Sequence, residues 1–127
     1  MEEIYQQFII ELYKNPLNFG KLENPTFTAI LHNTTCGDKI EIFLKTENGK
    51  GSGKIINVKY VGTGCAISQA SASLFTNFLK GKRISDIKSG KINKDSVLSL
   101  LKVDLSKNPS RMKCALLVLD AVKNAVQ

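Results

Sequence analysis

The sequence predicts an α+β fold in which a three-stranded antiparallel sheet is covered on one side by helices, with helices at the N- and C-terminal ends. Three segments, 26–32, 40–45 and 56–60, alternate apolar and polar residues, as strands with one buried face do. They follow one another with short connections, which is typical of an antiparallel meander. Segments with a helical spacing of apolar residues lie before and after them.

The first predicted helix covers residues 2–14, because Ile4, Phe8 and Leu12 recur every four residues. It ends at Asn15-Pro16, since the residue before a proline disfavours the α region. A loop then leads to the first strand. That helix therefore precedes the predicted sheet.

The predicted strands each have one apolar face. In the first strand this face is Phe27, Ala29 and Leu31, while His32, the only histidine of the chain, lies on the other face as a half-exposed residue. The apolar positions of the other two strands are Ile40, Ile42 and Leu44, and Ile56, Val58 and Tyr60. The glycine-rich segment 47–53 is interpreted as a hairpin connection, because it lacks the Gly-Lys-Ser/Thr ending of a phosphate-binding loop.

The stretch Gly62–Ser73 joins the third strand to a helix predicted over residues 65–80, with Gly81 as its C-terminal cap. Cys65 stands where this helix should begin. A thiol at that place faces unpaired backbone N–H groups and the positive end of the helix dipole. Both stabilise the thiolate, which is the better nucleophile and metal ligand.

Residues 84–103 are predicted to form short helices broken near Gly90. Asn108 as N-cap and Pro109 at the first helical position begin the last helix. Its apolar stripe consists of Met112, Ala115, Leu116, Leu119, Val122 and Val126. Because Cys114 is off that stripe, we expect it to point at something other than the core.

Composition limits the class of protein. A chain of 127 residues fits a single domain, 1–127, and its net charge of +7 comes mainly from lysine. The densest basic stretch, 80–94, has no interleaved aromatic residue for base stacking, so a solvated face is favoured over a nucleic-acid partner. An acidic N-terminus and the absence of a long apolar run predict a cytoplasmic protein with no membrane segment.

Three cysteines, Cys36, Cys65 and Cys114, carry the chemistry of the chain. An odd number of widely spaced cysteines argues against a disulfide framework. Asp38 follows Cys36 after one glycine, so the four residues supply four anionic ligands, enough for tetrahedral zinc or iron. A basic nucleic-acid-binding module with a structural zinc is a further, less favoured alternative.

Four motifs in order resemble the U-type iron–sulfur cluster assembly scaffold family, which includes the N-terminal domain of NifU. The first is Tyr13-Lys14-Asn15-Pro16 with Asn18 and Gly20, and the second is Cys36-Gly37-Asp38. The third and fourth are Gly64-Cys65-Ala66-Ile67-Ser68 with Ala70-Ser71-Ala72-Ser73 and Lys80-Gly81-Lys82, and Arg111-Met112-Lys113-Cys114-Ala115. The resemblance covers nearly the whole chain.

Within this family the sequence is more similar to the SufU-like branch than to the IscU-like branch. Lys113 precedes the third cysteine, where IscU-like proteins have a histidine, and their proline-rich chaperone-binding motif is replaced by Asn108-Pro109-Ser110. Two features depart from relatives. Only 48 residues separate Cys65 from Cys114, which is short for the SufU-like branch, and Leu12 stands where many relatives have histidine.

The resemblance implies a metal site formed by Cys36, Asp38, Cys65 and Cys114. SufU-like relatives hold zinc there and accept persulfide sulfur from a PLP-dependent, SufS-like cysteine desulfurase. IscU-like relatives assemble a [2Fe–2S] cluster at the same place, which is the alternative reading, and both pass sulfur or clusters to downstream assembly or acceptor proteins. By analogy, Cys36 is the sulfur acceptor, Cys114 the alternative acceptor, and Arg111 a contact for the thiolate or the desulfurase. Such a protein is a scaffold or sulfur acceptor rather than an independent enzyme.

Overall fold

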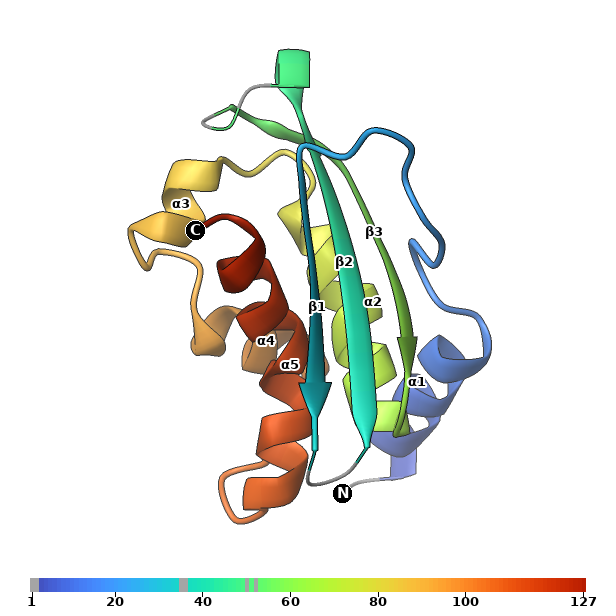
Figure 1. Cartoon of the computed structure of the whole chain (residues 1–127). Coiled ribbons are helices and arrows are strands. Elements are labelled where there is room, and N and C mark those ends of the chain that lie inside the picture. Colours follow the sequence, from blue (N-terminus) through green and yellow to red (C-terminus); the bar gives the residue numbers. More distant parts are fainter. Residues whose placement is uncertain (1–2, 35–36, 50, 52) are drawn as a thin grey trace.

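The computed structural model describes residues 3–34, 37–49, 51 and 53–127 (Figure 1). In chain order its elements are α1 (Glu3–Lys14), β1 (Phe27–Asn33), β2 (Asp38–Thr46), the 3-10 turn η1 (Glu47–Gly49), β3 (Ile55–Thr63), α2 (Ala66–Leu79), α3 (Ile84–Lys88), α4 (Lys94–Leu101) and α5 (Pro109–Ala125). Each predicted helix and strand has a counterpart among them. The predicted break near Gly90 separates α3 from α4, as expected.

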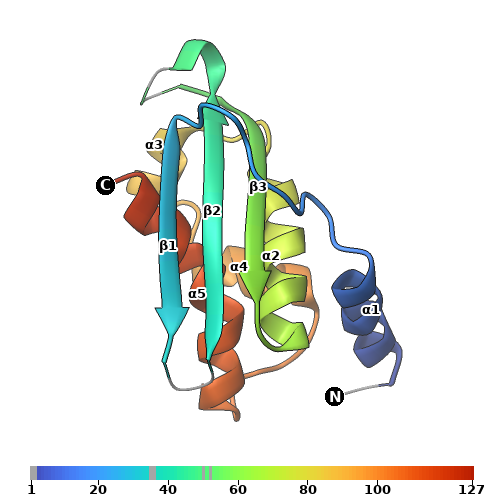
Figure 2. The same ribbon diagram turned by 45° about the vertical axis from the view of Figure 1, so that its right-hand side comes forward.

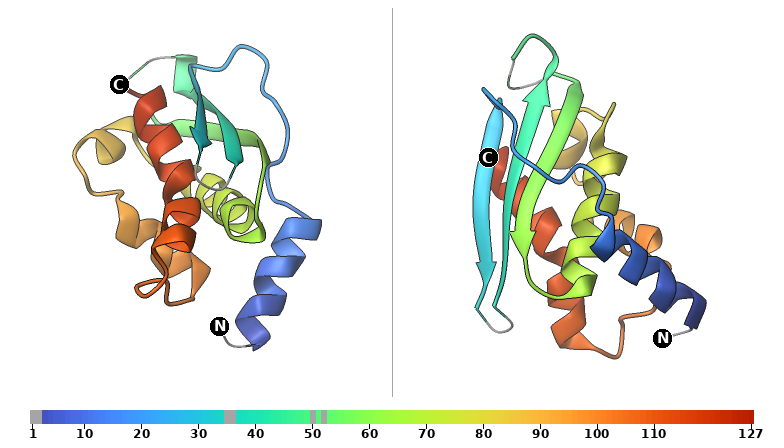
Figure 3. Two further views of the ribbon diagram at one scale, coloured as in Figure 1. Left: turned by 60° about the horizontal axis from the view of Figure 1, so that its bottom comes forward. Right: turned by 90° about the vertical axis from the view of Figure 1, so that its right-hand side faces the viewer.

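The three strands form one antiparallel sheet in the order β1-β2-β3. Helices α2 and α5 pack on one face of it, α5 under β1 and β2 and α2 under β3, while α4 packs on α2 and α5 (Figure 2). No helix of the described residues covers the other face (Figure 3). The predicted α+β class, with a meander covered on one side, is therefore confirmed.

The third strand differs in detail from its prediction. It begins at Ile55, which is fully buried, whereas Ile56, predicted to face the core, is 52% exposed. A register shift between Lys45 and Thr46 pairs Thr46 with Ile55 and Lys45 with Asn57. This irregularity places one extra residue on β3, so the alternation of faces changes there, and periodicity alone does not reveal such a bulge.

The main core lies between the sheet and the two covering helices. It contains Ile40, Ile42 and Leu44 from β2 together with Val58 and Tyr60 from β3. Helix α5 is buried over a wider arc than its predicted stripe, because Leu117, Val118 and Ala121 are buried as well. The reason is that α5 contacts the sheet on one side and α2 and α4 on the other.

A second cluster joins α1 to the beginnings of α2 and α5. It consists of Ile9, Leu12, Ile67, Ala70, Leu101, Leu105, Cys114 and Ala115. The buried Leu12 thus packs as a core residue. Cys114 is only 4% exposed and belongs to this cluster, so it is buried among apolar residues although it lies off the predicted stripe. The α1 helix creates this second apolar environment, which the stripe on α5 does not reveal.

Tyr60 connects the sheet to α2 through a buried hydroxyl group. Its hydroxyl shares a hydrogen bond of 2.9 Å with the Ser73 hydroxyl, and its ring contacts Phe19 edge-on at 5.4 Å between centroids. Burial raises the pKa of Tyr60 above the usual 10.0, although the Ser73 hydrogen bond lowers it in part. The neutral phenol is therefore the form that the folded protein accommodates.

Replacing Tyr60 with phenylalanine is expected to lower the unfolding free energy by about 1–2 kcal/mol at neutral pH, because the buried hydrogen bonds of its hydroxyl with the Ser73 hydroxyl and the Gln69 carbonyl are lost. The difference from wild type should shrink above pH 10.0. There the phenol of the unfolded chain ionises before the folded one, so wild-type stability falls as pH rises. Urea unfolding between neutral and alkaline pH measures both effects. The control is Tyr13→Phe, because Tyr13 is exposed. If the stability difference between wild type and Tyr60→Phe is the same at alkaline as at neutral pH, the buried phenol of Tyr60 is not the source of the pH dependence.

Candidate metal centre

The site lies at the end of the sheet where β2 begins, β3 ends and α2 and α5 begin (Figure 1). Asp38 is the first residue of β2 and Cys65 is the N-cap of α2. Asp38 is 1% exposed, and its Oδ1 accepts a hydrogen bond of 2.9 Å from the Cys65 backbone N–H. The other carboxylate oxygen, Oδ2, lies 3.6 Å from Cys65 Sγ. One oxygen therefore positions Cys65 while the other faces its sulfur.

Gly64 allows this close approach of Asp38 to the turn before α2. A Cβ atom at Gly64 would lie 2.0 Å from Asp38 Oδ1, and the residue has a φ of +138°. Both the position and the backbone angle exclude a side chain. The turn is completed on the helix side, where the carbonyl of Cys65 accepts from the Ser68 hydroxyl at 3.0 Å and the Gln69 N–H at 3.2 Å.

Cys114 reaches the same place from α5. Ligand atoms of Asp38, Cys65 and Cys114 all lie within 4.8 Å of one another. Helix α5 starts as predicted, since Asn108 caps it by accepting from the Arg111 N–H at 3.2 Å and Pro109 is its first residue. The cap fixes where α5 begins, so that Cys114 lies in its second turn, close to Asp38 and Cys65.

The ligand atoms of Asp38, Cys65 and Cys114 suit a metal ion that binds sulfur and prefers tetrahedral coordination, as zinc does. Zinc binds thiolate sulfur at about 2.3 Å and carboxylate oxygen at about 2.0–2.2 Å, so neighbouring ligands lie about 3.5–3.8 Å apart. The Asp38 Oδ2–Cys65 Sγ distance of 3.6 Å already matches that geometry, and the other ligand pairs, at most 4.8 Å apart, would have to close by no more than about 1 Å. Two thiols and one carboxylate leave one position of a tetrahedron for a further ligand.

The two described cysteines differ in access to solvent. Cys65 is exposed and Cys114 is buried. A hollow of about 360 Å³ opens beside both, between α1 and the beginnings of α2 and α5. Its lining residues are Gln6, Ile9, Ile10, Cys65, Ala66, Ile67, Ser110, Arg111 and Cys114. The site is thus reached through a largely apolar opening with the exposed Arg111 at its rim.

The structure brings together three of the four predicted ligands, Asp38, Cys65 and Cys114. The fourth, Cys36, lies outside the described residues. Sequence reasoning missed the contribution of α1, which supplies Gln6, Ile9 and Ile10 to the opening. It also missed the contact of Gly64 with Asp38, although the Gly-x-Gly turn before Cys65 was a signal for it.

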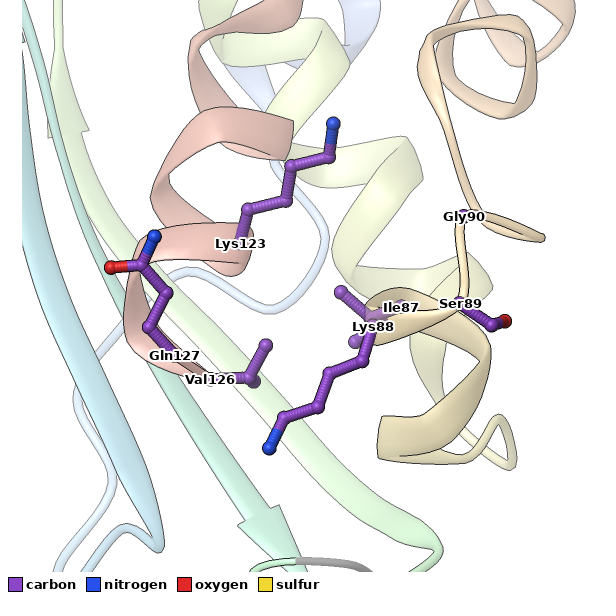
Figure 4. A pocket seen from close by; sticks show the side chains of 7 residues that line it. All are labelled: Ile87, Lys88, Ser89, Gly90, Lys123, Val126 and Gln127. Atoms are coloured by element: carbon purple, nitrogen blue, oxygen red, sulfur yellow. The ribbon is translucent and has the colours of Figure 1, made fainter.

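His32 and Lys113 line a different hollow of about 420 Å³, between the end of β1 and α5. His32 is exposed, as predicted, and is not in the described ligand cluster. A third hollow, of about 590 Å³, lies between α3 and the end of α5 (Figure 4). Ile87 and Val126 contribute its apolar surface, and the residues around it offer no thiol, imidazole or side-chain carboxylate. Among the described residues, neither hollow is lined by three His, Cys, Asp or Glu side chains, whereas Asp38, Cys65 and Cys114 form such a group.

The buried Asp38, Cys65 at the N-cap position of α2 and Cys114 of α5 thus form a candidate metal centre in an α+β fold. Comparison with known proteins specifies the class further. The profile of the family described as NifU-like N terminal domain matches residues 4–127, and this chain belongs to that family. The predicted relationship to iron–sulfur cluster assembly scaffolds is thereby confirmed.

Two curated relatives align over almost the whole chain. The zinc-dependent sulfurtransferase SufU of Bacillus subtilis (strain 168) is 37% identical, over 99% of this chain and 91% of its own. The iron–sulfur cluster assembly scaffold protein IscU of Thermotoga maritima is 32% identical, over 98% of this chain and 93% of its own. The relatives therefore include members named after both branches, SufU and IscU.

A solved structure supports the same relationship. A protein of Fervidobacterium islandicum AW-1, described as an iron–sulfur cluster assembly scaffold for the SUF system (FiSufU), has a TM-score of 0.74 and 26% identity, covering 100% of this chain and 96% of its own. Among the described residues, no helix has the length and apolarity needed to cross a membrane.

Proposed function

We propose that this protein accepts persulfide sulfur from a cysteine desulfurase for iron–sulfur cluster assembly and holds zinc at Asp38, Cys65, Cys114 and Cys36. The observation that carries the proposal is the convergence of the first three ligands, from three separate elements, within 4.8 Å. The 37% identity to a relative named a zinc-dependent sulfurtransferase favours zinc as the metal. A cytoplasmic location remains the prediction of the sequence.

Sulfur acceptance requires an ionised and accessible thiol. The acceptor thiolate attacks the terminal sulfur of the desulfurase persulfide, the sulfur–sulfur bond breaks, and the desulfurase cysteine leaves as a thiolate. The exchange is balanced, since one persulfide is lost and one is formed. A bound zinc ion would keep the site's thiols deprotonated between transfers.

Cys36 is the proposed acceptor, by analogy with SufU-like relatives. The buried Cys114 is better suited to a ligand role than to the alternative acceptor role, because an incoming persulfide must reach the attacking sulfur. Cys65 is exposed but is tied through its backbone N–H to Asp38. We assign it to holding the metal.

Arg111 is proposed as a contact for the desulfurase or for the acceptor thiolate. It is exposed on the rim of the opening, one helical turn before Cys114. A guanidinium group remains charged at physiological pH and offers several donors to an anionic group. An anionic persulfide or an acidic side chain of the partner would be attracted to it.

The test is sulfur transfer from a purified SufS-like desulfurase with cysteine, read by a persulfide-specific label and peptide mass spectrometry. We expect one labelled cysteine at Cys36 in the zinc-loaded protein and no label in Cys36→Ser. Replacing Arg111 with alanine should reduce the labelling rate about tenfold while zinc content stays unchanged, as expected for loss of one charged contact.

Lys113→Ala is the matched control for the arginine variant, because Lys113 is an exposed cation two residues further along α5. It should label at the wild-type rate. Wild-type protein that takes up no sulfur from the desulfurase would remove the proposed function. Labelling of Cys65 or Cys114 instead would move the acceptor assignment but leave the function in place.

Assembly of a [2Fe–2S] cluster is the second candidate function, and the 32% identity to a relative named IscU favours it. Anaerobic purification and metal analysis separate the two functions. A colourless protein with about one zinc ion per chain supports the sulfur acceptor, whereas a brown protein with acid-labile sulfide supports the cluster scaffold.

A further inference from the structure

Of the two edges of the sheet, the β3 edge is hydrogen-bonded to loop residues, whereas the β1 edge is open. Along β3, the N–H of Gly20 donates to Tyr60 O at 2.8 Å and the Tyr60 N–H donates to Asn18 O at 3.1 Å. At the other end of β3, the Ile55 N–H donates to Lys82 O at 2.7 Å and its carbonyl accepts from the Gly81 N–H at 2.8 Å. The loop after α1 and the turn after α2 thus occupy this edge.

The edge formed by β1 has no such cover. Its seven residues, Phe27–Asn33, pair with β2 alone in the sheet. Among the described residues, no backbone group outside β2 pairs with residues 28–32. The ribbon views agree, since no segment runs alongside the outer edge of β1 (Figures 2 and 3). Alternate N–H and C=O groups of an edge strand point outward and are available to another strand.

The sequence of β1 lacks the features that usually protect an open edge. It contains no lysine, no other formally charged residue and no proline, and its pairing with β2 is regular throughout. Proteins normally place charges, prolines or bulges on exposed edges to prevent pairing. At the middle of the strand, Ile30 is 47% exposed, although the chain as a whole is rich in lysine.

We propose that two copies of this chain associate through antiparallel pairing of their β1 strands. Pairing centred on Ile30 places this residue against Ile30 of the second copy and Thr28 against His32 of the second copy. The three exposed residues of β1 are thereby paired, isoleucine with isoleucine and threonine with histidine, and no two like formal charges lie opposite each other. The contact is isologous, so it closes as a dimer. It covers the exposed isoleucine on both chains.

The uncharged sequence of β1, which can pair with itself in register, favours a second copy as the occupant. Two proteins of net charge +7 repel one another over most of their surfaces. At the β1 edge two copies can approach each other without placing a lysine in the strand pair, because β1 contains none. An acidic partner would instead be matched by lysines on the strand that receives it, and β1 has none.

The resulting dimer has a six-stranded sheet and leaves both metal centres open. Each β1 runs towards the end of its own sheet that holds Asp38. Because the two strands run in opposite directions, the two centres lie at opposite ends of the joined sheet. A partner can therefore reach either centre without crossing the dimer contact. The contact is also independent of the proposed sulfur chemistry.

Sedimentation velocity of the zinc-loaded, reduced protein tests the proposal over about 10 µM to 1 mM, since a contact of one strand pair is small and expected to be weak. We expect the mass to rise from one chain to two as concentration increases. Amide hydrogen exchange in β1 should slow over the same range, while exchange in β3 stays constant. A protein that remains one chain at the highest concentration overturns the proposal.

Ile30→Lys is the decisive variant and Ile56→Lys is its matched control. Both residues are about half exposed on the sheet, but Ile56 lies on β3, away from the open edge. In the proposed register, a lysine at position 30 of one chain would lie opposite the lysine at position 30 of the other. The repulsion between the two charges should weaken dimerisation at least about tenfold. Ile56→Lys should dimerise as wild type does, and circular dichroism verifies the fold of both. Equal weakening by the two variants, or none by Ile30→Lys, overturns the proposal.

Discussion

Replacing Cys65 with serine is expected to remove tight zinc binding while the fold remains intact. Serine cannot supply the thiolate, but it is a preferred N-cap residue, so α2 should begin as before. The backbone N–H of residue 65 can still donate to Asp38 Oδ1, because that bond does not involve the side chain. Metal affinity should fall at least about 100-fold, since loss of a residue that only supports a ligand already costs about 10- to 100-fold.

Competition with a chromophoric chelator measures this affinity, and thermal unfolding with and without zinc measures its linkage to stability. Wild-type protein should gain melting temperature from zinc, because a ligand that binds only the folded state stabilises it. The serine variant should gain little. Thr63→Ser, an exposed substitution just before the site, is the control and should retain zinc. Tight zinc binding by the Cys65→Ser protein would show that this thiol is not a ligand.

Replacing Gly64 with alanine is expected to destabilise the fold strongly and to weaken metal binding. The added Cβ would lie 2.0 Å from Asp38 Oδ1, and the backbone has a φ of +138°, which L residues rarely adopt. The turn would have to move away from Asp38, which breaks the hydrogen bond to the Cys65 N–H. We expect a loss of at least about 3 kcal/mol in unfolding free energy together with weaker zinc binding.

Gly81→Ala separates the steric effect from the backbone effect. Gly81 also has a positive φ, +87°, but a Cβ there meets no atom within 4 Å. This variant should therefore lose only about 1 kcal/mol and keep its affinity for zinc. Urea unfolding and zinc titration of both proteins provide the measurement. Similar losses in the two variants would indicate that contact with Asp38 has no role at this turn.

Cys65 and Cys114 illustrate how one site can combine a fixed and an accessible sulfur. The buried Cys114 is surrounded by residues of the second apolar cluster and is shielded from solvent. Cys65 faces solvent at the opening between α1 and α5. A thiol that must remain a ligand gains from burial, whereas one that meets a partner must be reached. Burial therefore favours the ligand role for Cys114, whereas Cys65 is assigned to the metal because its backbone N–H is bound to Asp38.

The sequence by itself determined the α+β class, the antiparallel meander and the two helices that present Cys65 and Cys114. Alternating residues in 26–32 and 40–45 and the helical spacing after Cys65 are local patterns, and local patterns report local structure directly. The beginning of α2 at Cys65 and the Asn108 cap of α5 were predictable for the same reason, since they depend on residues adjacent in the chain. The family resemblance supplied the joint role of the ligands.

Only the tertiary structure decided which side chains meet and which are reached by solvent. The burial of Cys114 depends on α1, which is distant in sequence, and the need for glycine at position 64 depends on Asp38, which enters from another strand. The bulge that exposes Ile56 arises from the pairing of β3 with β2. The open edge of β1 likewise exists because loops cover β3 and not β1. Each of these follows from contacts between distant segments, which periodicity within one segment does not record.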